Sequence, residues 1–165
     1  MSGDAARVAE QEFEALIGPL VEPGLRLAYS MLGDRAEAED ATQEAITKAW
    51  RRLRSLRDRD TARPWFLAIV ANQCRNVRRT RWFRTVRLPA VFQPSVAATQ
   101  LDRLDIERAL ARLSMGDRQI LFMHYYLDLP IEEIAIALGI SRAAAKGRIY
   151  RACKRLRPGL LEEDI

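Results

Sequence analysis

The chain has 165 residues, of which 48% are hydrophobic and 30% are charged, and it carries a formal net charge of +5 at pH 7. This balance is typical of a folded globular protein and excludes an intrinsically disordered chain. The sequence contains no apolar run long enough to cross a bilayer and no signal-peptide core, so we expect a cytoplasmic protein without membrane insertion.

Cysteine and histidine are too sparse for a metal site. Cys74 and Cys153 stand alone, and His124 is the only histidine. Zinc sites and disulfide frameworks require clustered ligands. We therefore expect no metal, no cofactor and no small-molecule ligand, and we expect both cysteines to be core or helix-surface residues.

Charge is distributed in blocks along the chain. No acidic residue occurs between Asp60 and Asp102, or between Glu133 and Glu162, although both stretches are rich in arginine. Acids are instead concentrated in the segment 34–44. Two separated basic blocks predict two contacts with one polyanion.

Apolar residues recur at helical spacing along most of the chain, and no stretch alternates strictly, so the sequence predicts an all-α protein. A first helical segment is expected from Phe13 to Leu32, with an interruption at Pro23-Gly24 and an end at Gly33.

Asp34 and Glu37 form a capping-box pattern at the start of the next predicted helix. The apolar face of this helix consists of Ile46, Trp50 and Leu53. Glu37, Asp40 and Glu44 share a second, exposed face. That face is either a solvated surface or a docking surface for a basic partner helix, and the spacing alone favours the solvated surface.

A further helix is expected near Pro64, because proline is tolerated in the first turn, and the second half of this helix is cationic. Asn72 and Asn76 lie on one face with Arg75 and Arg79 as neighbours. Amide and guanidinium groups in this arrangement are candidates for contacts with bases or phosphates.

Aromatic residues occur at both ends of this helix. Trp65 and Phe66 are expected in the core, whereas Trp82 and Phe83 either stack on single-stranded DNA or anchor the segment that follows. That segment has two prolines and no amphipathic pattern, which predicts an extended linker. The predicted organisation is a domain at 1–84, a linker at 85–103 and a domain at 104–165.

The second domain is predicted to contain a helix-turn-helix. Ser114 with Asp117 repeats the capping pattern, Pro130 opens a short helix, and Gly139 ends it. A three-residue turn then leads to a helix capped by Ser141. Helix, short turn and helix in this order are the layout of a DNA-binding helix-turn-helix.

The last predicted helix has an exposed face of one charge sign. Ile140, Ala145 and Ile149 are expected to pack inward, and Ser141 leaves the helix N-terminus open to a phosphate. The opposite face presents Arg142, Lys146, Arg148 and Arg151 to a major groove. A solvated basic face would carry the same charge, but the turn glycine, the serine cap and the absence of acids together favour DNA binding.

The segments LGDRAEAEDATQEAITKAW and LSMGDRQILFMHYYLDLPIEEIAIALGISRAAAKGRIYRACKRLR, in this order, resemble the extracytoplasmic-function sigma factors of bacterial RNA polymerase. The resemblance implies that the first domain is sigma region two, which docks on the clamp helices of the polymerase largest subunit and melts the minus-ten promoter element. It implies that the second domain is sigma region four, which reads the minus-thirty-five element. It also implies an anti-sigma factor as a partner.

The resemblance assigns polymerase binding to Asp34, Glu37, Asp40, Gln43 and Glu44. Together with the charge pattern, it assigns binding of promoter DNA to Arg63, Asn72, Arg75, Asn76, Arg78, Arg79, Ser141, Arg142, Lys146, Arg148 and Arg151. We expect sequence choice to depend upstream on Arg142, Lys146 and Arg148, and downstream on Asn72 and the Leu56–Arg63 loop.

Two other classes of protein fit part of the pattern. An autonomous helix-turn-helix regulator would bind duplex DNA without polymerase, usually as a dimer, but the chain shows no dimerisation heptad. An enzyme acting on DNA would need a nucleophile with partners or a carboxylate cluster near the basic blocks, and the acids of segment 34–44 lie apart from them. We therefore expect a transcription initiation factor and not an enzyme.

Overall fold

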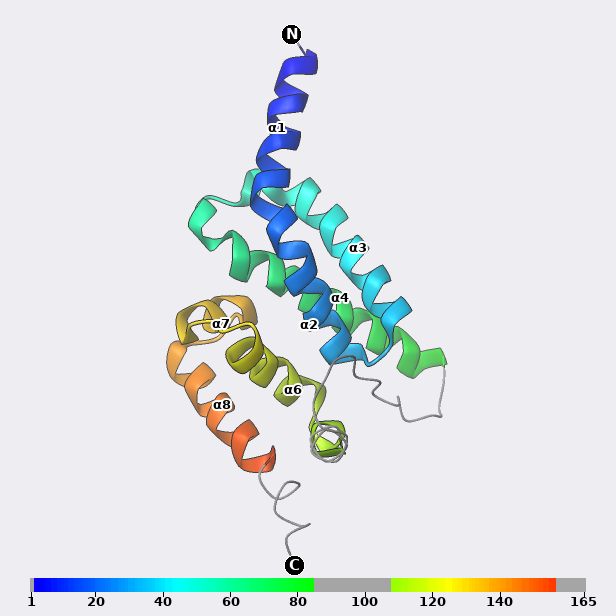
Figure 1. Cartoon of the computed structure of the whole chain (residues 1–165), viewed down its shortest axis with the longest axis vertical. Helices are drawn as coiled ribbons and strands as arrows, with labels where there is room; N and C mark the ends of the chain where they lie inside the picture. The colour runs from blue at the N-terminus through cyan, green and yellow to red at the C-terminus, as the bar shows by residue number, and fades with distance from the viewer. Residues whose placement is uncertain (1, 85–107, 157–165) are drawn as a thin grey trace, which may run out of the picture.

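The computed structural model describes residues 2–84 and 108–156, and within these ranges all regular secondary structure is helical (Figure 1). The N-terminal group consists of α1 (Ser2–Ile17), η1 (Gly18–Leu20), α2 (Val21–Leu32), α3 (Arg35–Arg52), η2 (Leu53–Ser55), η3 (Arg59–Thr61) and α4 (Ala62–Arg84). The C-terminal group consists of a helical stretch at 108–112, then α6 (Met115–Leu121), η4 (Phe122–Tyr126), α7 (Ile131–Leu138) and α8 (Arg142–Leu156). The all-α prediction is confirmed. The predicted linker lies outside the described residues.

The interruption expected at Pro23-Gly24 is wrong. The chain breaks earlier, in the 3-10 turn η1 that contains Pro19, and α2 continues without a break from Val21 to Leu32. Pro23 is tolerated because it lies in the first turn of α2, where backbone amides have no intrahelical acceptor. Gly33 ends α2 as predicted, with a left-handed φ of 71°.

Small residues allow α2, α3 and α4 to pack closely. The buried face of α3 consists of Ala38, Ala41, Thr42, Ala45 and Ala49. On α2, a Cβ added to Gly24 would lie only 2.9 Å from Cε1 of Phe66 and 3.2 Å from Cγ2 of Val70. Phe66 and Val70 are fully buried. The core of the N-terminal group therefore lies where α2 crosses α4.

Two of the predicted helix caps are present in the framework of the fold. Asp34 accepts a hydrogen bond from the amide of Glu37 at 2.9 Å, and Ser114 accepts one from the amide of Asp117 at 3.1 Å. The carboxylates of Glu37 and Asp117 each pair with an arginine far along the chain. In each of these two residues, the backbone amide completes the cap at the helix start, and the carboxylate links that helix to another one.

A π-helical turn, η4, extends α6. The amide of Leu127 donates to the carbonyl of Phe122, five residues back, at 3.0 Å, and the rings of Phe122 and Tyr126 stack with their centroids 4.5 Å apart. Asp128 then adopts a left-handed φ of 51°. The π-helical turn therefore ends at Tyr126, and no amide of the helix reaches the carbonyl of its C-cap residue, Leu127.

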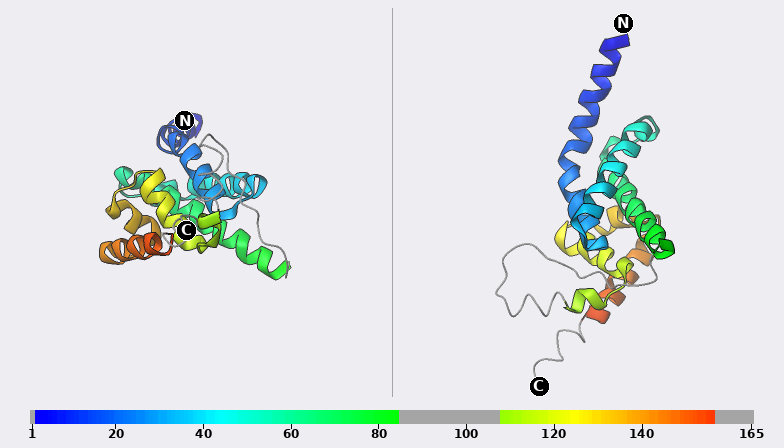
Figure 2. Two further views of the ribbon diagram at one scale, coloured as in Figure 1. Left: turned by 60° about the horizontal axis from the view of Figure 1, so that its bottom comes forward. Right: turned by 90° about the vertical axis from the view of Figure 1, so that its right-hand side faces the viewer.

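The two groups of helices pack against each other, α7 against α4 and α6 against α2 (Figure 2). The predicted helix-turn-helix is formed by α7, the turn at Gly139 to Ser141, and α8, and Gly139 has a left-handed φ of 63°. Helix α1 extends away from the packed helices (Figure 1). This arrangement places both basic helices, α4 and α8, next to the boundary between the groups.

Candidate nucleic-acid interface

Helix α8 exposes its basic side chains as predicted. Its buried face consists of Ala145, Ile149 and Ala152. Ser141 caps the helix, because its Oγ accepts a hydrogen bond from the amide of Ala144 at 3.1 Å. Arg142 pairs with Glu132 on α7, at 3.0 Å between Nε and Oε1. The exposed basic residues of α8 that have no ion pair with another described residue include Lys146, Arg148 and Arg151.

Helix α4 arranges asparagine and arginine in two adjacent side-chain pairs. Arg75 donates from Nη1 to Oδ1 of Asn72 at 2.7 Å, and Arg79 donates from Nη2 to Oδ1 of Asn76 at 3.1 Å. All four side chains are exposed. Each arginine occupies the amide oxygen of its neighbour, so the donor that each asparagine can offer to a base or a phosphate is its amide nitrogen.

Two of the predicted DNA contacts, Arg63 and Arg75, also reach the C-terminal group. Arg63 donates from Nη2 to the carbonyl of Leu127 at 2.6 Å, and its Nε lies 3.9 Å from Oε2 of Glu133. Arg75 donates from Nη2 to Oε1 of Gln119 at 3.0 Å. In this arrangement, the side of α4 that carries these arginines faces the C-terminal group.

Arginines of α4 approach arginines of the C-terminal group. Desolvation lowers the pKa of the Arg118 guanidinium, and the positive charge of Arg78 lowers it further. The pKa of Arg75 is also lowered, first by desolvation and then by the charge of Arg148. Arg75 and Arg148 come from the two basic blocks of the sequence, so charges of these blocks repel each other in the folded chain.

The predicted polymerase-binding residues lie at the start of α3 and along it, but they differ in their contacts. Asp34 is occupied as the helix cap, and the carboxylates of Glu37 and Glu44 each pair with a basic side chain. Asp40 and Gln43 are exposed, and their side chains have no partner among the described residues. Asp40 and Gln43 are thus the members of this set that a partner protein can contact without breaking a bond to another described residue.

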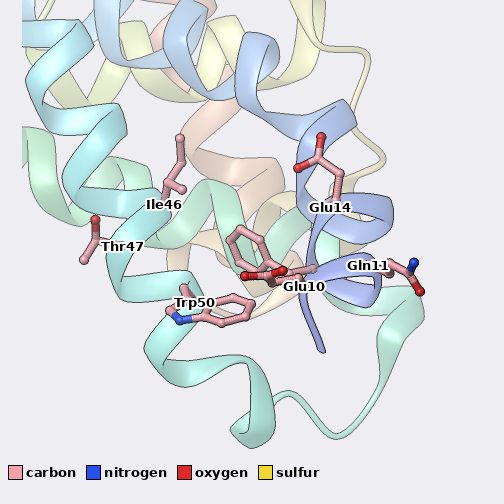
Figure 3. Close-up of a pocket in the computed structure, with 7 residues that line it drawn as sticks. Glu10, Gln11, Glu14, Ile46, Thr47 and Trp50 are labelled. Atoms are coloured by element: carbon pink, nitrogen blue, oxygen red, sulfur yellow. The ribbon is translucent and has the colours of Figure 1, made fainter. Parts of the chain in front are cut away.

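An open groove of about 610 Å³ continues this surface towards α1 (Figure 3). It is lined by Glu10, Gln11, Phe13 and Glu14 of α1 and by Ile46, Thr47 and Trp50 of α3. Trp50 is 44% exposed and packs edge-on against Phe13, with the ring centroids 5.2 Å apart. The sequence pattern placed Ile46 and Trp50 on an apolar face but did not indicate a groove, because the groove depends on where α1 lies.

Arg59 fixes the loop between α3 and α4, and the sequence pattern did not single it out. Its Nη1 donates to the carbonyls of Leu53 and Leu56, at 3.2 and 2.6 Å, and its Nε donates to Oε1 of Glu12 at 2.7 Å. One guanidinium thus holds the first part of the predicted specificity loop against α1. Arg59 is one of several arginines in this stretch, so composition alone gave no signal for its role.

The cysteines have the environments expected of core and helix-surface residues. Cys74 is fully buried, and desolvation raises the pKa of its thiol to about 12. Cys153 is partly exposed, and its Sγ lies 3.4 Å from the hydroxyl of Tyr125. Residues 2–84 and 108–156 contain no cluster of three or more side chains suited to hold a metal ion. Among the described helices, none has the length and hydropathy of a membrane span.

Both helical groups match known family models. The Sigma-70 region 2 model matches residues 18–84, and the Sigma-70, region 4 model matches residues 103–156. The ECF RNA polymerase sigma factor SigL of Mycobacterium tuberculosis is 35% identical over 150 residues, which cover 85% of this chain and 84% of SigL. The RNA polymerase sigma factor SigV of Bacillus subtilis is 29% identical over 142 residues, which cover 85% of this chain and 86% of SigV.

Solved structures share the fold. The sigma factor RpoE of Bartonella quintana, in complex with the anti-sigma factor NepR, matches with a TM-score of 0.76 and 21% identity, over 93% of this chain and 99% of RpoE. CnrH, in complex with the cytosolic domain of CnrY, matches with a TM-score of 0.70 and 25% identity, over 98% of this chain and 96% of CnrH. The helix-turn-helix, together with the matches to region 2 and region 4, identifies a DNA-binding transcription protein. The chain belongs to the extracytoplasmic-function sigma factors of RNA polymerase.

Proposed function

We propose that this protein is an alternative sigma factor that binds core RNA polymerase and directs initiation of transcription at specific promoters. The observation that carries the proposal is the presence, in one chain, of an exposed acidic surface on α3 and two basic surfaces on α4 and α8. Such a chain can attach polymerase to a promoter at two points, and two linked contacts bind more tightly than either one alone.

In this proposal, residues 1–84 form the polymerase-docking and minus-ten domain. The clamp helices of the largest polymerase subunit contact Asp40 and Gln43, with support from Asp34, Glu37 and Glu44. The neighbouring groove beside Trp50 accepts an apolar side chain of the same partner. Acidic groups around an apolar groove favour a partner that is basic and amphipathic.

Helix α4 and the loop before it contact the minus-ten element. The amides of Asn72 and Asn76, oriented by their arginine neighbours, are suited to bases that have left the duplex. Arg63, Arg78 and the two oriented arginines supply phosphate contacts, which add affinity without sequence choice.

Residues 104–165 form the minus-thirty-five domain, and residues 85–103 link it to the first domain. Lys146 and Arg148 of α8 read base edges in the major groove, while Arg151 and the capped N-terminus at Ser141 contact phosphates. Arg142 contacts DNA either after its ion pair with Glu132 breaks or while it bonds both Glu132 and the DNA.

An anti-sigma factor is the proposed inhibitor, since RpoE and CnrH were each solved in a complex, RpoE with an anti-sigma factor. Such a partner would cover the polymerase-binding surfaces. The protein performs no covalent chemistry of its own and acts in the cytoplasm, where core polymerase works.

Purified full-length protein and core RNA polymerase test the proposal directly. We expect a stable complex in gel filtration and transcripts from a subset of promoters that core polymerase alone does not use. Absence of a complex, together with tight sequence-specific duplex binding by a dimer of the protein alone, would instead identify an autonomous helix-turn-helix regulator.

A further inference from the structure

Helix α1 lies outside both family matches, since the Sigma-70 region 2 match begins at residue 18 and α1 covers Ser2–Ile17. The C-terminal half of α1 is nevertheless fixed to the rest of the N-terminal group. Ile17 is fully buried, and the ring of Phe13 packs edge-on against Trp50 of α3. Glu12, next to Phe13, therefore has a defined position from which it can hold another part of the molecule.

Glu12 holds the predicted specificity loop, Leu56–Arg63, through the side chain of Arg59. Nε and Nη2 of Arg59 lie 2.7 and 2.6 Å from Oε1 of Glu12. Nη1 of the same guanidinium donates to the carbonyls of Leu53 and Leu56, at 3.2 and 2.6 Å. All three guanidinium nitrogens are therefore engaged, and they tie the loop to α1 on one side and to the end of α3 on the other.

The local backbone explains why the loop needs this support. Leu56 is the C-cap residue of η2 and has an extended backbone, so no further helical turn supplies a donor to its carbonyl. The side chains of Leu53 and Leu56 are buried, whereas those of Arg57 and Asp58 are exposed. Contacts of two leucines and one guanidinium thus fix a segment whose next side chains face outward.

We propose that Arg59 is a positioning residue for promoter recognition: it orders the specificity loop, and Glu12 of α1 holds its guanidinium in place. This proposal rests on the proposed contact of the loop with the minus-ten element. A loop that is ordered before it meets DNA loses less conformational entropy when it binds the matching sequence. The phosphate contacts of α4 hold any sequence. Loss of the Arg59 contacts should therefore reduce discrimination between sequences more than affinity for DNA as such.

The test uses the holoenzyme, formed from core polymerase and the full-length protein. One probe is a single-stranded oligonucleotide with the minus-ten element of a promoter that the holoenzyme transcribes, and the other has one base of that element replaced. The measured quantity is the ratio of the two affinities, which does not depend on the folded fraction of the protein. Arg59→Lys should lower this ratio about fivefold, because an ammonium group keeps the charge but lacks the planar fork that bonds Glu12, Leu53 and Leu56 together.

Glu12→Gln separates positioning from direct contact with DNA. Removal of an acid ordinarily strengthens attraction to phosphates, and an arginine released by it would strengthen that attraction further. The positioning role predicts instead that the ratio falls about twofold, because one partly exposed ion pair is lost. Asp4→Asn is the matched control, since it removes the same charge from an exposed part of α1, and it should leave the ratio unchanged. Glu12→Gln should add nothing to Arg59→Ala, because Glu12 acts through Arg59.

A ratio that is unchanged in Arg59→Lys or in Glu12→Gln would overturn the proposal, and so would equal falls in Glu12→Gln and Asp4→Asn. The wild-type protein distinguishes this outcome from failure of the proposed function. A wild-type protein that forms no holoenzyme, or whose holoenzyme binds both oligonucleotides equally, would refute the proposed function and this inference with it. A wild-type holoenzyme that discriminates, with variants that discriminate equally well, would refute the inference alone.

Discussion

The two carboxylate oxygens of Asp117 accept hydrogen bonds from Nη1 of Arg155, at 2.9 and 2.8 Å, and so join α6 to the C-terminal end of α8. The side chain of Asp117 is 15% exposed, whereas that of Arg155 is 56% exposed. Arg155 therefore holds α8 against α6, although it belongs to the same basic block as the proposed DNA contacts.

Arg155→Ala and Arg148→Ala should separate a structural from a DNA-binding arginine. The Arg155→Ala protein should lose about 1 kcal/mol of unfolding free energy, because the mostly buried carboxylate of Asp117 loses its partner. The Arg148→Ala protein should change by less than about 0.5 kcal/mol. The Arg148→Ala substitution should nevertheless reduce transcription that depends on the upstream promoter element about tenfold, with polymerase binding unchanged. Urea unfolding and run-off transcription measure the two effects, and equal losses of stability would contradict this assignment.

Asp40→Lys should weaken binding to core polymerase by about tenfold or more, because Asp40 is exposed and is proposed to face a basic partner. Asp4→Lys, with the same change of net charge, should have little effect. Circular dichroism should show unchanged helix content in both proteins. Equal affinities of the two variants in a polymerase pull-down would place the docking surface elsewhere.

The helical glycines Gly24 and Gly147 should respond oppositely to alanine. Gly24→Ala places a Cβ 2.9 Å from the buried ring of Phe66, so it should destabilise the protein by about 1–2 kcal/mol. At Gly147 the nearest atom is the flexible end of Arg151, at 3.2 Å, so alanine should stabilise α8 by about 0.5–1 kcal/mol. Chemical denaturation measures both values, and a stabilising Gly24→Ala would show that α2 and α4 are not in close contact there.

The two thiols should differ in reactivity at pH 8. The thiolate is the reactive form, and burial raises the pKa of Cys74 to about 12, so this residue stays protonated and shielded. Cys153 is partly exposed and should react with Ellman's reagent within minutes. The native protein should release one equivalent of chromophore and the denatured protein two. Cys74→Ser should leave the native value unchanged, and rapid release of two equivalents by the native protein would contradict the burial of Cys74.

Features that depend on local chemistry were predictable from the sequence. The caps at Asp34, Ser114 and Ser141 and the glycine ends at Gly33 and Gly139 all occur where the residue pattern placed them. Each depends on one side chain or one backbone angle within a few residues. The fold class and the helix-turn-helix followed from the same local signals.

Features that depend on tertiary packing were not predictable in this way. The break at Pro19 and the uninterrupted helix through Pro23 could not be distinguished, because proline is compatible with both a break and a first helical turn. The groove beside Trp50 depends on the position of α1. The contacts of Arg63 with the C-terminal group depend on a π-helical turn that has no sequence signature of its own.

Glu37 of α3 and Arg81 of α4 form an ion pair, at 3.1 Å, between the helix proposed to meet polymerase and the helix proposed to meet DNA. A basic group of polymerase that takes over Glu37 releases Arg81 for a phosphate. Conversely, a phosphate that binds Arg81 releases Glu37 for polymerase. Linkage between two ligands is reciprocal, so each ligand would strengthen binding of the other by the same free energy. Under the proposed function, this one shared ion pair would make loading of polymerase and capture of the promoter mutually cooperative.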